Sequence, residues 1–163
     1  MPLDTITGEQ AKFRFVVLPG KPATLARPAD FDTAAKELPE LTTSNFPAQV
    51  ATNTTPTPKM YGTPKAGESV TWAKPTPGEA TWTGTLAGNV QPTEAERVAM
   101  DTLRNALGKY IWMEQVLDGE TTPEGGCAIV TSRGRPVPAD GVVTFDIGLT
   151  GYGPNFLDTK NIA

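Results

Sequence analysis

The sequence contains no histidine, one cysteine and no long apolar run. Without histidine there can be no Ser-His-Asp or Cys-His triad, no imidazole general base and no zinc site with a histidine ligand. The single Cys127 cannot form an internal disulfide, which favours maturation in a reducing compartment. No stretch approaches the 18 apolar residues of a membrane span, and the N-terminal MPLDTITGEQ lacks a secretory-signal pattern. These absences predict a soluble protein that is not an enzyme.

Positive charge is also scarce. The chain has 14 Lys and Arg against 18 Asp and Glu, a net charge of −4. A protein that grips nucleic acid through phosphates needs a surplus of cations, so the balance disfavours nucleic-acid binding. The acidic surplus lies after residue 109, where 7 acidic residues accompany 3 basic ones. The simplest interpretation is a solvated acidic surface.

A length of 163 residues predicts one domain, 1–163, and 16 Gly with 16 Pro predict a chain rich in β-strands and loops. β-formers, near alternation and flanking turn residues predict several strands. The expected strands are residues 12–18, 80–87, 109–117, 127–132 and 141–151. In the last of these, Phe145, Ile147 and Leu149 alternate with polar or small residues, which predicts one buried and one open face.

A long loop is predicted over residues 39–78, where Thr, Pro and Lys predominate. Its prolines forbid helix and confine any strand to an edge, although a short hairpin could form around residues 69–72. A loop of this length in a compact domain is either disordered or functional, and we expect residues 42–78 to be mobile in a free subunit and ordered only against a neighbouring subunit. Residues 28–38 could begin a short helix that stops before Pro39.

One amphipathic helix is predicted over residues 94–107. Thr93 and Glu96 have the spacing of a capping box, and apolar residues recur at helical spacing up to Leu107. Gly108 then ends the helix.

No group of residues has the spacing of a catalytic, cofactor or metal site. Glu114, Asp118, Glu120 and Glu124 do not match an EF-hand, and a solvated turn explains them better. Cys127 has no neighbouring base and is interpreted as a buried apolar residue. The aromatic Trp112 lies in the most apolar segment, which indicates a core position.

The order of these elements resembles that of the major tail tube proteins of long, non-contractile-tailed bacteriophages. The resemblance covers roughly residues 79–155. It rests on the segments TWTGTL, TEAERVAMDTLRNAL, KYIWMEQVL, CAIVTSRGRPVP and the closing PADGVVTFDIGLTGYG. It implies a mainly β fold, a β-sandwich or half-barrel with one flanking amphipathic helix and a long extended loop.

The same resemblance implies a structural virion protein, made in the host cytoplasm, whose copies form hexameric rings. Such rings stack into a hollow tail tube through which phage DNA passes without specific binding. The partners would be further copies and other phage tail proteins, with no cofactor and no membrane. Closing sheets into a ring would also remove their exposed edges.

Under this hypothesis Asp146 is the first candidate for a charge facing the lumen, and Glu114 is the second. Trp72, Trp82 and Tyr61 are candidate subunit contacts. Two alternatives remain open. One is a monomeric β-sandwich that binds a ligand or glycan through Trp72 and Trp82, and the other is a hydrolase with paired carboxylates.

Overall fold

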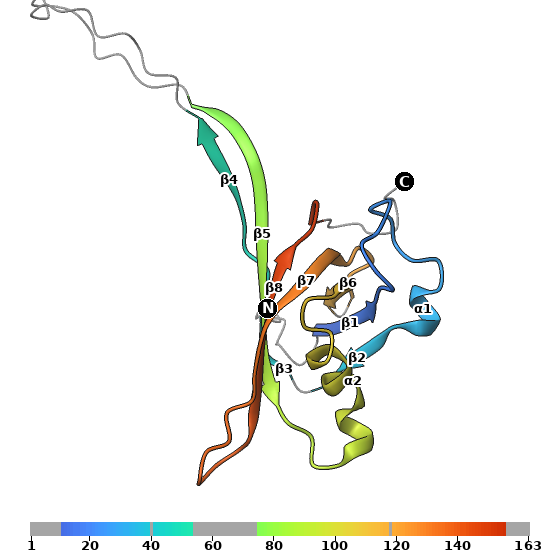
Figure 1. Cartoon of the computed structure of the whole chain (residues 1–163), viewed down its shortest axis with the longest axis vertical. Helices are drawn as coiled ribbons and strands as arrows, with labels where there is room; N and C mark the ends of the chain where they lie inside the picture. The colour runs from blue at the N-terminus through green and yellow to red at the C-terminus, as the bar shows by residue number, and fades with distance from the viewer. Residues whose placement is uncertain (1–10, 40, 54–74, 118, 156–163) are drawn as a thin grey trace, which may run out of the picture.

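The fold is mainly β, with one large antiparallel sheet and two helices (Figure 1). The computed structural model describes residues 11–39, 41–53, 75–117 and 119–155. Its elements are β1 (Ala11–Val17), α1 (Phe31–Ala34), β2 (Lys36–Leu38), β3 (Leu41–Asn45), β4 (Ala48–Asn53), β5 (Thr76–Asn89), α2 (Glu94–Arg104), β6 (Tyr110–Leu117), β7 (Glu124–Gly134) and β8 (Thr144–Gly151). The strand order is β2-β1-β6-β7-β8-β5-β3, and β4 pairs with β5. The predicted mainly β class with a flanking helix is therefore confirmed, while the single domain stays a prediction.

The sheet curls into a half-barrel around one core. The two sides of the curled sheet approach each other where Phe13 of β1 stacks on Phe46, which directly follows β3, with ring centroids 6.0 Å apart. Alternate residues of the strands point inward, because side chains along a strand alternate between faces. Helix α2 covers the open side and contributes Met100 and Leu103 to this core, and Ala106, just after the helix, also belongs to it.

Helix α2 begins as predicted. The backbone N–H of Glu96 donates to Thr93 Oγ1 at 3.4 Å, and the Thr93 hydroxyl donates to Glu96 Oε2 at 2.6 Å. The helix ends at Arg104 rather than at Leu107, which is 46% exposed. At that end, Arg133 Nη1 of β7 donates to the Arg104 carbonyl at 2.7 Å, so a cation caps the negative end of the helix.

A second, smaller core lies on the outer face of the sheet. Phe31 of α1 packs with Trp112 of β6 and Cys127 of β7, and all three side chains are buried. This confirms the interpretation of Trp112 and Cys127 as buried residues. The helix predicted within 28–38 is only one turn long, because residues 36–38 pair with β1 as strand β2.

The prediction of a loop over residues 39–78 is wrong near both ends of this range, where the chain forms strands instead. β3 and β4 each pair with β5, and the register with β4 shifts between Val50 and Thr52. Prolines are tolerated here because the pairing lies at the edge of the sheet. β4 and the first half of β5 form a two-stranded ribbon, the arm, which projects from the body (Figure 1). The hairpin predicted around residues 69–72 lies outside the described residues.

Candidate functional site: a polar sheet face with open edges

One face of the β7-β8-β5-β3 part of the sheet carries short polar side chains. The register places Thr83 beside Thr150 and Ala87 beside Asp146, while Phe145, Ile147 and Leu149 of β8 point into the core. The exposed residues of this polar face are Thr43, Asn45, Thr83, Thr85, Ser132, Asp146 and Thr150. In Figure 1 the helices lie on the other side of β5 and β8, which leaves this face bare in the described part of the chain.

Asp146 is the one charged side chain on the polar face within the described strand residues of this four-stranded region. It pairs in register with Gly134 of β7. A Cβ atom at Gly134 would overlap the Asp146 carboxylate, so the glycine leaves room for that carboxylate above the sheet. The predicted alternation of this strand is confirmed, and Asp146 stays exposed on its open side.

The polar face ends in two strand edges that have no partner within the described residues. β3 pairs with β5 along one edge only. β7 pairs with β6 no further than Ile129, so residues 132–134 pair only with β8. Successive strands are antiparallel, so β3 and β7 run in opposite directions. Such edges present unpaired backbone N–H and C=O groups to another chain.

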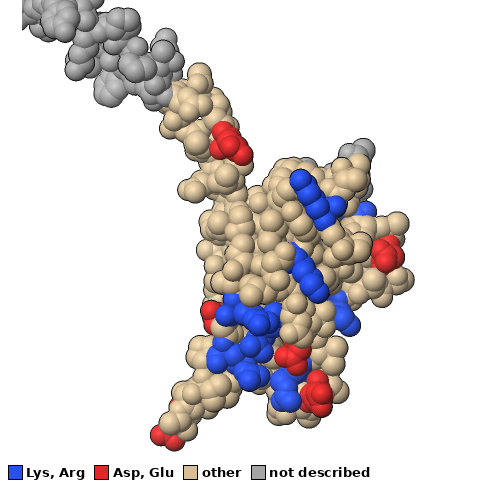
Figure 2. All heavy atoms as spheres, viewed as in Figure 1, with Lys and Arg blue, Asp and Glu red and all other residues tan. Residues whose placement is uncertain are grey.

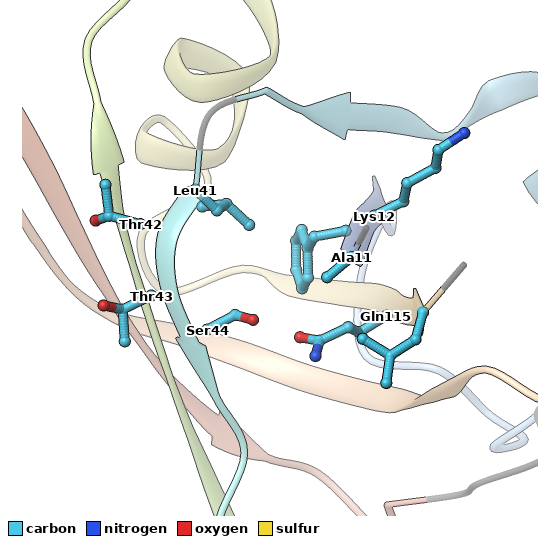
Figure 3. Close-up of a pocket in the computed structure, with 9 residues that line it drawn as sticks. Ala11, Lys12, Leu41, Thr42, Thr43, Ser44 and Gln115 are labelled. Carbon is cyan, nitrogen blue, oxygen red and sulfur yellow. The ribbon is translucent and has the colours of Figure 1, made fainter. Parts of the chain in front are cut away.

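Behind β3 the half-barrel remains open, and a cleft of about 350 Å³ separates β3 from β1 and β6. Figure 3 shows Ser44 and Gln115 pointing toward each other across the cleft, whereas Thr42 and Thr43 point away from it. The Oε1 atom of Gln115 is buried without a hydrogen-bond partner in the part of the chain described. The sheet therefore does not close upon itself at β3.

Glu114 does not lie on the polar face. Its side chain is 1% exposed and accepts hydrogen bonds from Arg27 Nε at 2.5 Å and Arg14 Nη2 at 3.4 Å. Arg27 also pairs with Asp32 at 2.7 Å, and both guanidinium groups lie over the Phe31 ring. The hydrogen bonds that Arg27 donates to Asp32 and Glu114 raise the pKa of Arg27 above its ordinary value. The prediction of Glu114 as a lumen charge, and its interpretation as part of a solvated turn, are thus corrected.

Trp82 also lies elsewhere than predicted. Its ring is 4% exposed, packs edge-on against Phe46 and donates from Nε1 to the Gly153 carbonyl at 2.9 Å. The side chain is a core residue, so it offers no surface for a subunit contact or for stacking on a sugar. The other two predicted contacts, Trp72 and Tyr61, lie outside the described residues.

The remaining candidate groups provide no reactive site. Burial raises the pKa of the Cys127 thiol to about 11, which disfavours the nucleophilic thiolate at neutral pH. Within the described ranges, no three Cys, Asp or Glu side chains gather as metal ligands. The helices described here are too short or too polar to cross a membrane.

No family model matches this sequence, and no curated protein matches it. Solved structures match over most of the chain. A chain from the virion of a native gene transfer agent particle aligns with a TM-score of 0.58 and 10% identity, covering 93% of this chain and 97% of its own. The tail of an empty gene transfer agent particle with C6 symmetry gives 0.53 and 10%, with coverages of 93% and 98%. The SPP1 tail tube gives 0.57 and 16%, with coverages of 95% and 82%.

The chain therefore shares its fold with proteins of these virion and tail structures. More narrowly, the chain has the fold of siphophage-type tail tube proteins, which confirms the resemblance seen in the sequence.

Proposed function

We propose that this chain is a structural virion protein that forms stacked, hexameric rings, and that these rings make the hollow tail tube through which phage DNA passes. The observation that carries the proposal is the bare polar face, bounded by two open strand edges, on a fold shared with tail tube structures. The protein is made in the host cytoplasm and resides in the virion. Its partners are further copies and other tail proteins, and it has no catalytic role.

Ring closure follows from the two open edges. Placing β3 of one copy beside β7 of the next continues the antiparallel alternation, because these strands run in opposite directions. A ring of such contacts leaves no edge of the polar face exposed, which removes the tendency of open strands to aggregate. The C6 symmetry of one matched tail supports six copies.

The polar face would then line the lumen. Its short hydroxyl and amide side chains make no strong attraction to phosphate, and its one charge, Asp146, repels phosphate. Repeated Lys or Arg contacts along many rings would instead sum to a tight, salt-dependent grip on DNA. The face therefore suits a wall along which DNA moves without binding.

The substitution Asp146→Lys tests this assignment. We expect tubes of normal appearance by negative-stain microscopy but impaired DNA passage, with partial recovery at higher salt. Glu37→Lys makes the same charge change at an exposed position on β2, away from the polar face, and should leave DNA passage normal. Normal DNA ejection, or a loss of tubes, in the Asp146→Lys variant would refute the lumen position. Wild-type protein that forms neither rings nor tubes would refute the proposed function itself.

The glycan-binding alternative gains no support from the structure. It relied on Trp72 and Trp82, of which Trp82 is buried and Trp72 lies outside the described residues.

A further inference from the structure

Backbone hydrogen bonds between β3 of one copy and β7 of the next do not by themselves fix how far the two strands slide along each other. A slide of two residues keeps every side chain on its own face, because side chains along a strand alternate between faces. The exposed side chains of β3 are short and polar, so they distinguish poorly between registers. The register sets the tilt of the strands and thereby the number of copies that close a ring. A side-chain contact at this edge would therefore decide ring closure.

One row of side chains crosses the four strands on the core side of the sheet. Ser44 of β3 pairs in register with Leu86 of β5, and Leu86 pairs with Ile147 of β8. Ile147 in turn pairs with Arg133 of β7. The two middle residues, Leu86 and Ile147, are buried. Ser44 and Arg133 therefore stand at the two ends of the row, each on a strand edge that has no partner at this level in the described part of the chain.

The Ser44 end of the row opens into the cleft between β3 and the strands β1 and β6, where Ser44 points toward Gln115 (Figure 3). The buried Oε1 atom of Gln115 receives no hydrogen bond from any residue that the structure describes. Buried acceptors are normally satisfied in a complete structure. Lys12 is the one charged residue among those described that line the cleft, and its ammonium group points away from Ser44 and Gln115 in Figure 3. The cleft therefore holds an acceptor that needs a donor.

The Arg133 end of the row supplies donors. Arg133 follows Ser132 and precedes Gly134, which both lie on the polar face, so its side chain projects from the core side. There Nη1 donates to the Arg104 carbonyl, and this is the one hydrogen bond of the Arg133 side chain among the described residues, which include no ion pair to it. Figure 2 shows Lys and Arg side chains gathered on the lower part of the body, where β7 ends in Figure 1. The guanidinium group thus keeps N–H donors for an acceptor on another chain.

We propose that Arg133 of one copy continues the row beside Ser44 of the next copy in the ring, enters the cleft and donates to Gln115 Oε1. The inference rests on the proposed ring and names the side-chain contact that fixes its register. A guanidinium group carries five N–H donors, so one nitrogen can keep the bond to the Arg104 carbonyl while another donates to Gln115. Neighbouring strands lie about 4.8 Å apart, which a long arginine side chain spans.

Disulfide trapping tests the register. Residues directly opposite each other in an antiparallel pair have Cα atoms about 4.5–5.5 Å apart, which suits a disulfide. Within one copy Ser44 and Arg133 are three strand spacings apart, roughly 14 Å, so a bond between them must join two copies. After oxidation, Ser44→Cys/Arg133→Cys should give a ladder of covalent oligomers up to six copies on a non-reducing gel. The control Ser44→Cys/Arg135→Cys shifts one thiol by two residues, to about 8 Å, and should give no ladder.

The substitution Gln115→Leu tests the acceptor. It removes the buried oxygen but keeps the size of the side chain, so the urea midpoint of the unassembled chain should not fall. The protein concentration at which half of the chains assemble should rise at least tenfold by sedimentation velocity. Arg133→Gln should have a similar effect, and the double variant should assemble no worse than the weaker single, because both changes remove one contact. The control Lys36→Gln removes a positive charge at an exposed site on β2 and should assemble like wild type.

A missing ladder for the Ser44 and Arg133 pair, or an equal ladder for the control pair, would overturn the inference. So would normal assembly of Gln115→Leu, or losses that multiply in the double variant, because the two side chains would then act separately. In each of these cases assembly of the wild-type protein would leave the proposed function standing. Wild-type protein that forms no rings would overturn the proposed function and this inference together.

Discussion

Replacing Glu114 by glutamine removes one charge from a buried cluster and keeps the shape of the side chain. Glu114 is 1% exposed, while the Arg27 and Arg14 side chains that donate to it are 15% and 31% exposed. Breaking a buried ion pair costs about 3–5 kcal/mol, because the remaining charges stay desolvated. Partial exposure of the arginines lets water compensate in part, so we expect Glu114→Gln to lower the free energy of unfolding by about 3 kcal/mol.

Urea denaturation measures this loss, with the slope of the transition unchanged, and the melting temperature should fall by roughly 6–12 °C. Asp32→Asn is the matched control, since Asp32 pairs with Arg27 but is 66% exposed. An exposed pair contributes little, so this variant should lose less than about 1 kcal/mol. The reasoning is refuted if Glu114→Gln costs less than about 1 kcal/mol, or if the two variants cost the same.

Three other perturbations have defined outcomes. Burial raises the pKa of the Cys127 thiol from 9.0 to about 11, so the thiol loses its proton at a lower pH in the unfolded chain than in the folded one. The free energy of unfolding should therefore fall by up to about 3 kcal/mol as the pH rises from 9 to 11. Urea melts of Cys127→Ala should lack that part of the decline. Thr93→Ala should cost about 1 kcal/mol in the same assay, since it removes the cap of α2, and no loss would show that the cap is dispensable. Gly151→Ala would place a Cβ atom against the Trp82 indole, so thermal unfolding should show a loss of about 1–3 kcal/mol in the free energy of unfolding. The control Gly20→Ala adds its Cβ atom in open space and should leave this free energy nearly unchanged.

Local patterns predicted the elements that depend on local interactions. The capping box located the start of α2, and the period of two in β8 placed Asp146 on the open face. The flanks of the predicted loop were missed because prolines signal loop, while the partner that makes β4 a strand is β5, more than twenty residues further along the sequence. Pattern alone does not tell an edge strand with proline from an extended loop.

The failure at Glu114 has a different cause. Its partners Arg27 and Arg14 are 87 and 100 residues away in sequence, so no spacing rule associates them. A carboxylate within an apolar strand was the available signal, because a buried charge requires a partner. Trp82 was assigned to a surface by its proline-rich neighbours, but the alternation of β5 turns it inward with Leu86.

β5 takes part in two ladders at once, with β4 over residues 76–82 and with β3 and β8 over residues 83–89. Any force applied to the arm would therefore pass along this one continuous backbone into the sheet of the body. Ladder hydrogen bonds lie perpendicular to antiparallel strands, so a pull along β5 loads many of them in shear together instead of peeling them one by one. The mechanical attachment of the arm to the body would then depend on one fourteen-residue strand.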